Sequence, residues 1–63
     1  MPLAIIHIME GRDDAKKARA IEAVTQALVD TLDAKPETVR VVLLEVPKTQ
    51  WGIGGKTAKQ LGR

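Results

Sequence analysis

The amino-terminal part of the chain contains a nearly unbroken apolar run from Leu3 to Ile8, preceded by Pro2 and followed by Glu10-Gly11. A run this short and this rich in isoleucine predicts a β-strand rather than a buried helix. Side chains alternate between the two faces of a strand, and both faces here are largely apolar. We therefore expect both faces to be covered. One face carries Leu3, Ile5 and His7, and the other carries Ala4, Ile6 and Ile8.

The next pattern is helical and covers a segment without glycine or proline. Asp13 and Asp14 supply the carboxylates that favour a helix start, and apolar residues then recur at helical spacing. The helix is expected to end near Asp33, because the ring of Pro36 clashes with a preceding helical turn. The apolar stripe consists of Ala18, Ile21, Val24, Thr25, Leu28 and Leu32, and the solvated face carries Lys16, Glu22, Gln26 and Asp30.

A second β-branched and leucine-rich run extends from Val39 to Val46. Strand, helix and strand follow one another at the length of a right-handed β-α-β unit, in which the two strands are parallel. After Pro47 the chain becomes polar, and Trp51-Gly52-Ile53-Gly54-Gly55 predicts a glycine-dependent turn or hairpin before a basic tail from Lys56 to Arg63. The predicted fold is α/β, a single β-α-β unit with a C-terminal hairpin, forming one domain over residues 1–63.

Chain length adds a requirement for self-association. A domain of 63 residues buries only about 60% of the surface that its unfolded chain exposes. There is no cysteine and only one histidine, so neither disulfides nor a histidine cluster supplement the core. One helix also covers only one face of a two-stranded sheet. We therefore expect a homo-oligomer in which sheets pair or stack, with any active site between subunits.

Charge and composition point away from nucleic acids and membranes. The ten basic and eight acidic residues are scattered, and Trp51 is the single aromatic residue. No apolar stretch is long enough to span a bilayer, and the start lacks a signal-peptide pattern, so we expect a cytoplasmic protein. The alternative is a non-catalytic basic oligomer that binds an acidic protein or nucleic acid through Arg12, Arg40 and the tail from Lys56 to Arg63.

The usual catalytic arrangements of side chains are missing. There are no thiols, His7 has no second histidine near it, and no metal-binding or phosphate-binding motif occurs. His7 is interpreted as structural, Asp13 and Asp14 as helix-capping residues, and the hairpin glycines as turn residues that tolerate positive φ. We expect neither a metal nor a cofactor.

Pro2 is the remaining candidate for acid–base chemistry. A proline at this position can simply start a strand. Removal of Met1 before this small residue would instead expose a secondary amine at the strand end. An α-amino group titrates at about pH 8, and burial or neighbouring cations lower its pKa by disfavouring the protonated form. Such an amine can act as a general base at neutral pH.

Two arginines could provide an anion site near that amine. Arg12 follows a glycine turn, and Arg40 lies within an apolar strand. A guanidinium that loses water in such surroundings needs a compensating anion. That anion is either a substrate carboxylate bound through two hydrogen bonds or the carboxylate of Glu37 or Glu45 across a subunit boundary.

In order along the chain stand Met1-Pro2-Leu3-Ala4-Ile5-Ile6-His7-Ile8, Glu10-Gly11-Arg12, Val39-Arg40-Val41 and Trp51-Gly52-Ile53-Gly54-Gly55. Together these segments resemble the 4-oxalocrotonate tautomerase family. The resemblance covers nearly the full length, with the family's order and separations. It implies a β-α-β protomer that dimerises and assembles into a hexamer, a trimer of dimers.

The resemblance also implies a reaction, which makes the chain an isomerase. Pro2, once amino-terminal, would take the proton from the 2-hydroxyl group of a dienol dicarboxylate such as 2-hydroxymuconate and return that proton to carbon 5. The resemblance places this reaction in aromatic hydrocarbon catabolism. Arg40 would bind the carboxylate and oxygen next to the enol, and Arg12 the far carboxylate, both from neighbouring subunits. Trp51 would form an apolar wall that keeps the amine neutral. The backbone near Met9 would orient the substrate oxygen.

Two departures from the family pattern concern the substrate. The best-known members have phenylalanine where Trp51 stands and leucine where Met9 stands, and we expect the bulkier indole to narrow the site and alter the choice of substrate. Related hydrolytic dehalogenases of haloacrylates place a water-activating glutamate in the region of Ile53. This chain has no carboxylate there, so dehalogenation or hydration of an unsaturated acid, polarised by Pro2, Arg12 and Arg40, is the alternative and not the expected main activity. Pairing with a second, different short subunit is the alternative assembly.

Overall fold

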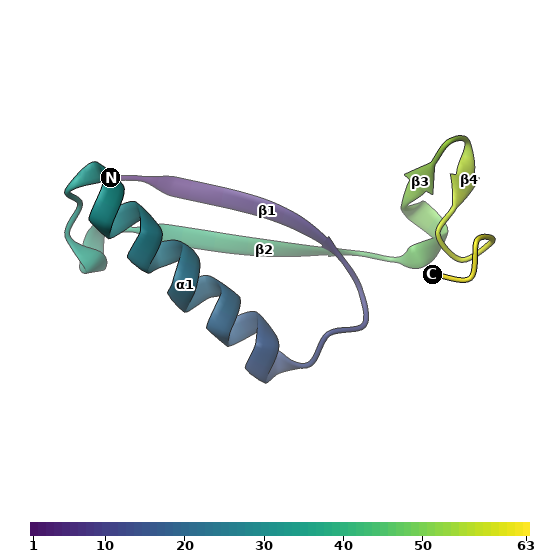
Figure 1. Cartoon of the computed structure of the whole chain (residues 1–63), viewed down its shortest axis with the longest axis horizontal. Helices are drawn as coiled ribbons and strands as arrows, with labels where there is room; N and C mark the ends of the chain where they lie inside the picture. The colour runs from purple at the N-terminus through teal and green to yellow at the C-terminus, as the bar shows by residue number, and fades with distance from the viewer.

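The structure is a computed structural model that describes all residues from Met1 to Arg63. It confirms the predicted α/β fold, a β-α-β unit followed by a C-terminal hairpin (Figure 1). In chain order the elements are β1 (Leu3–Met9), α1 (Asp14–Leu32), the single 3-10 turn η1 (Pro36–Thr38), β2 (Arg40–Val46), a second 3-10 turn η2 (Lys48–Gln50), β3 (Gly52–Ile53) and β4 (Lys56–Thr57).

The two long strands are parallel, as predicted. Their register pairs Leu3 with Arg40 at one end and Met9 with Val46 at the other. The first strand runs one residue beyond the predicted end. The second begins one residue after Val39, because the Val39 N–H donates to the Pro36 carbonyl at 3.1 Å and closes η1.

The predicted helix limits are also confirmed. The Asp13 carboxylate accepts a hydrogen bond from the Lys16 N–H at 2.8 Å, and Asp14 lies in the first turn, where a negative charge favours the helix. At the other end Asp33 adopts the left-handed conformation with φ 53°. A left-handed residue here ends the helix and turns the chain toward η1.

The apolar stripe of the helix is only partly covered. Val24, Thr25 and Leu28 are half-buried, whereas Ile21 and Leu32 stay exposed, and no residue of α1 is fully buried. A sheet of two strands is narrower than the stripe of a 19-residue helix, so part of that stripe lacks a partner within the protomer.

The sheet face opposite the helix is open and apolar. Leu3 and Ile5 on β1 are 61% and 56% exposed, and Val42 and Leu44 on β2 are 40% and 43% exposed. His7 and Arg40 lie on the same exposed face, as the alternation predicts. Only Val39 and Ala58 are buried in the whole chain. The protomer therefore presents a continuous apolar surface to solvent.

The C-terminal hairpin stands beyond the end of β2, away from α1 (Figure 1). Strands β3 and β4 are antiparallel, and Gly54 and Gly55 connect them with φ values of 60° and 89°. Two consecutive positive φ values explain the predicted dependence of this turn on glycine. The protomer is consequently long and thin, with extents of 42 × 23 × 13 Å. None of its helices combines the length and the hydropathy needed to cross a bilayer.

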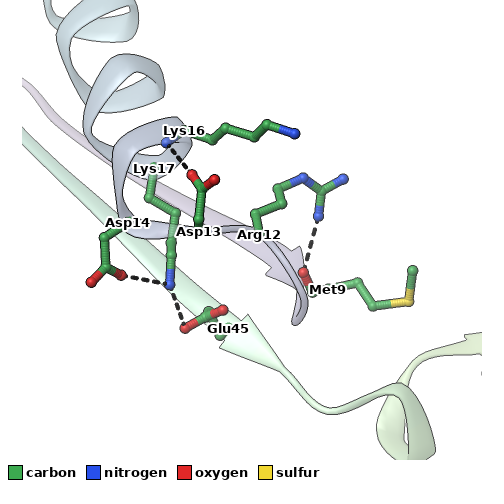
Figure 2. A network of polar contacts seen from close by, with 7 residues as sticks. All are labelled: Met9, Arg12, Asp13, Asp14, Lys16, Lys17 and Glu45. Carbon is green, nitrogen blue, oxygen red and sulfur yellow. Dashed lines mark hydrogen bonds and ion pairs between the residues drawn. The ribbon is translucent and has the colours of Figure 1, made fainter.

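An ion-pair cluster joins the helix to the sheet (Figure 2). The Lys17 ammonium donates to the Glu45 carboxylate on β2 at 3.0 Å and lies 3.3 Å from the Asp14 carboxylate. The hydrogen bond to Glu45, followed by that to Asp14, raises the pKa of Lys17 above its ordinary value of 10.5. The cluster therefore stabilises the packing of α1 on β2 while Lys17 is protonated.

We expect Lys17→Met to lower the free energy of unfolding in a pH-dependent way. A raised pKa in the folded state gives a contribution that is complete below 10.5 and is lost as the pH rises through the folded-state value. Urea unfolding at about pH 8 should separate wild type from variant, and at about pH 11.5 the difference should shrink. Lys16→Met is the matched control, and an equal effect of both substitutions, or a pH-independent difference, would contradict this assignment.

The open sheet face gives a prediction about assembly. The wild-type chain should behave as an oligomer at micromolar concentration, and Ile5→Lys should dissociate or unfold it, because an ammonium would be buried in the contact. Size-exclusion chromatography with light scattering measures the mass. Gln26→Lys on the exposed helix face should leave the mass unchanged. A folded wild-type monomer would contradict this prediction, because the open sheet face would then be stable in solvent without a second chain.

Candidate functional site

Pro2 and Arg40 meet at one end of the sheet. Pro2 directly precedes β1 and is half-buried, and its carbonyl accepts a hydrogen bond from the Arg40 N–H at 3.0 Å. This bond continues the parallel ladder by one step beyond the paired residues, so the amino terminus is held against the start of β2. The position of Pro2 is thus fixed by backbone geometry.

The Arg40 guanidinium lies at the same end of the sheet. Its Nη1 donates to the carbonyl oxygens of Glu37 and Val39, at 2.8 and 3.3 Å. Within the protomer no carboxylate pairs with it, because Glu45 is bonded to Lys17 and Glu37 contributes only its carbonyl. The positive charge of Arg40 therefore stays available to an anion.

Arg12 lies at the opposite end of β1. Gly11, with φ 122°, turns the chain away from the strand. The exposed Arg12 side chain folds back, and its Nη1 donates to the Met9 carbonyl at 3.0 Å (Figure 2). Arg12 also has no carboxylate partner, because the two ion pairs of the protomer both belong to Lys17. Its guanidinium is held in place by a neutral acceptor, and its charge is uncompensated.

Trp51 is positioned by the C-terminal segment. It follows η2, and its carbonyl accepts a hydrogen bond from the Ala58 N–H at 2.8 Å, which closes the hairpin behind it. The indole is half-buried, as is Met9 at the end of β1. Arg12 follows the end of β1 and Trp51 directly precedes β3, whereas Pro2 precedes the start of β1. The β3–β4 hairpin and the amino terminus lie at opposite ends of the molecule (Figure 1).

The candidate residues therefore form two separate groups in one protomer. One group, Pro2 with Arg40, lies at the start of β1, and the other, Arg12 with Met9, lies at its end, with Trp51 farther along in the C-terminal segment beyond β2. The seven residues of β1 lie between the groups and span about 23 Å at a rise of about 3.3 Å per residue. No arginine side chain bridges that distance. A site that uses both groups must combine at least two chains.

Beyond the candidate residues, the protomer has one surface hollow and one histidine. The one hollow in the protomer lies on the exposed side of α1 and is lined by Arg19, Glu22, Ala23 and Gln26. It contains none of the residues singled out in the sequence. His7 lies on the open sheet face beside apolar residues, and no group of three or more histidine, cysteine or acidic side chains is placed to hold a metal ion.

Comparison with known proteins identifies the relatives of the chain. Residues 2–60 match the family model described as tautomerase enzyme. A 2-hydroxymuconate tautomerase of Pseudomonas putida is 52% identical over 63 residues, which is the full length of both chains.

Two solved structures are similar to this chain in both fold and sequence. A 4-oxalocrotonate tautomerase isozyme from Methylibium petroleiphilum is 50% identical with a TM-score of 0.96, covering 98% of this chain and all of that one. A heterohexameric 4-oxalocrotonate tautomerase from Chloroflexus aurantiacus J-10-fl is 34% identical with a TM-score of 0.93, covering 97% of this chain and 98% of that one. The resemblance inferred from the sequence is confirmed, and this chain belongs to the tautomerase family of isomerases.

Proposed function

We propose that this enzyme converts the dienol of an unsaturated 2-hydroxy dicarboxylate, such as 2-hydroxymuconate, into its conjugated ketone. The single observation that carries the proposal is the presence of two guanidinium groups, Arg12 and Arg40, neither of which has a carboxylate partner in its own chain. A substrate with a carboxylate at each end supplies the two missing anions. The P. putida relative carries the name of this activity.

The proposed base is the amine of Pro2, freed by removal of Met1 from a single domain over residues 1–63. The amine takes the proton of the 2-hydroxyl group, and the electron pair of the O–H bond forms the C2=O double bond. The C2=C3 pair moves to C3–C4, and the C4=C5 pair moves onto carbon 5, where it forms the new C–H bond. The protonated amine then returns the proton to carbon 5. Atoms and electrons balance without a co-reactant, so the proposed chemistry uses one base and fixed charges and needs no metal or cofactor.

Charge development determines the proposed roles of the arginines. Negative charge moves from the 2-oxygen toward the far carboxylate as the proton leaves, so Arg40 beside the enol stabilises the start and Arg12 the end of that movement. Both guanidinium groups also disfavour the protonated amine, as does an apolar wall formed by Trp51. These effects lower the pKa of the Pro2 amine and keep it available as a base at neutral pH.

The proposed assembly is a homohexamer, a trimer of dimers, in the cytoplasm. Its support is the placement of the two groups at opposite ends of one strand. In the proposed contact, the open sheet faces of two copies pack in antiparallel orientation. Pro2 of each copy then lies near Arg12 and Trp51 of the other, so the contact forms two equivalent sites. We propose further that Arg40 also reaches the site from a neighbouring copy, and that Met9 contributes its backbone near the substrate oxygen.

Isomerisation is proposed in preference to hydrolytic dehalogenation because the hairpin carries a half-buried apolar Ile53. An isoleucine cannot activate water as a carboxylate does. Trp51 instead narrows the proposed site, which selects flat, unsaturated acids.

The proposal predicts that activity requires a free Pro2 amine. In Pro2→Leu the bulkier second residue should leave Met1 attached, and we expect kcat/KM for 2-hydroxymuconate to fall about 100-fold or more, the scale of a lost general base. In wild type, kcat/KM should rise with pH through the amine pKa and then level off. Intact mass spectrometry verifies the amino terminus, and an ultraviolet assay of ketone formation gives the rates.

Pro2→Ala is the matched control, because it exposes an amine at the same position and should retain more activity than Pro2→Leu. Full activity in chains that still carry Met1 would contradict the assignment of the base. Faster turnover of a 3-haloacrylate than of 2-hydroxymuconate would contradict the proposed reaction.

A further inference from the structure

The C-terminal segment from Pro47 to Arg63 has a single hydrogen bond to the rest of the protomer. All the other hydrogen bonds of the segment are internal, including those that close η2 and the β3–β4 hairpin. The exception runs from the Lys48 N–H to the Glu10 carboxylate, at 3.2 Å. The orientation of this segment therefore depends within one chain on the continuity of β2 and on Glu10.

Glu10 is held firmly enough to act as such an anchor. Its own N–H donates to the Val46 carbonyl at 3.0 Å, which extends the pairing of β1 and β2 by one residue. Gly11 then turns the chain away, so the Glu10 backbone is fixed just where β2 ends. The carboxylate reaches across to the first residue of η2, where it accepts from an N–H that has no partner within its own turn.

The segment that Glu10 anchors carries Trp51 three residues after Lys48. Because η2 is a single 3-10 turn and its Gln50 N–H bonds to the Pro47 carbonyl at 2.8 Å, the turn transmits the orientation of Lys48 directly to Trp51. The sequence shows Glu10 only as the residue that follows an apolar strand, because nothing in the local pattern indicates which distant N–H its carboxylate meets.

We infer that Glu10 is a positioning residue whose carboxylate sets the place of the hairpin and, through it, of the Trp51 wall in the active site. This inference rests on the proposed role of Trp51. It assigns to Glu10 no contact with substrate and no proton transfer. Its function is to keep the indole in the orientation that a narrow, flat substrate needs.

Three substitutions of Glu10 distinguish the effect of its side-chain length from the effect of its charge. Glu10→Gln keeps an acceptor oxygen at the same distance and loses the charge, whereas Glu10→Asp keeps the charge on a side chain one methylene shorter. Glu10→Ala removes both. Glu22→Ala is the matched control, because it removes an exposed carboxylate from α1 that makes no hydrogen bond or ion pair. Circular dichroism and light scattering on the assembled protein verify fold and mass.

The fluorescence of Trp51 reports directly on the C-terminal hairpin, because the chain has one tryptophan and no tyrosine or phenylalanine. In Glu10→Ala and Glu10→Asp we expect lower fluorescence anisotropy of Trp51 and a KM for 2-hydroxymuconate raised about fivefold, the scale of one lost hydrogen bond, with kcat nearly unchanged. Glu10→Gln and Glu22→Ala should resemble wild type in both measurements.

The possible failures are distinguishable. Unchanged anisotropy in Glu10→Ala and Glu10→Asp would overturn the inference, as would a pattern in which Asp restores KM and Gln does not, since charge would then matter and reach would not. Changed anisotropy with unchanged kinetics would support the positioning of the hairpin by Glu10 and would contradict the proposed place of Trp51 in the active site.

Discussion

The uncovered apolar face of the β1–β2 sheet is the constraint on which the rest of the structure depends. A chain of 63 residues supplies one helix for a sheet with two apolar faces, and α1 covers only the face of Ala4, Ile6 and Ile8. Leu3, Ile5 and their neighbours on β2 remain in solvent. Burying that apolar surface against another chain would stabilise the protomer.

The short length of the chain also explains why the candidate residues lie in separate parts of the protomer. A long, thin protomer has no interior in which to gather a base, two cations and an apolar wall. It places Pro2 and Arg40 at one end of the sheet and Arg12 at the other, with Trp51 in the C-terminal segment beyond β2. A contact that covers the open face can also join these ends. In this account, assembly stabilises the fold and completes the active site by the same contact.

Much of the fold follows from sequence because its signals are local. The apolar alternation of β1, the Asp13 cap and the Gly54-Gly55 turn each act over a few residues, and each lies where the pattern predicts. The exposure of Ile21 and Leu32 could not be read from helical spacing, because it depends on the width of the sheet beneath α1. The bond from Lys48 to Glu10 joins residues far apart in sequence, and only the three-dimensional structure shows it.

For the site, the sequence indicated which residues to examine and the structure showed how far apart they lie. Pro2, Arg12, Arg40, Met9 and Trp51 were singled out through charge, strand position and a family resemblance. The separation of the two groups by the length of β1 needed the register of the sheet. If Arg12 and Pro2 serve one active site, as proposed, that separation requires them to come from different chains.

Subunit mixing tests this requirement most directly. One chain carries Pro2→Leu and the other Arg12→Gln, and the two are unfolded together in equal amounts and refolded. If Pro2 and Arg12 of one site come from different chains, random mixing restores both groups in about one quarter of the sites, and the activity on 2-hydroxymuconate should rise well above that of either variant alone. Activity that stays at the level of the separate variants would contradict the account, because it would place Pro2 and Arg12 of each site in the same chain.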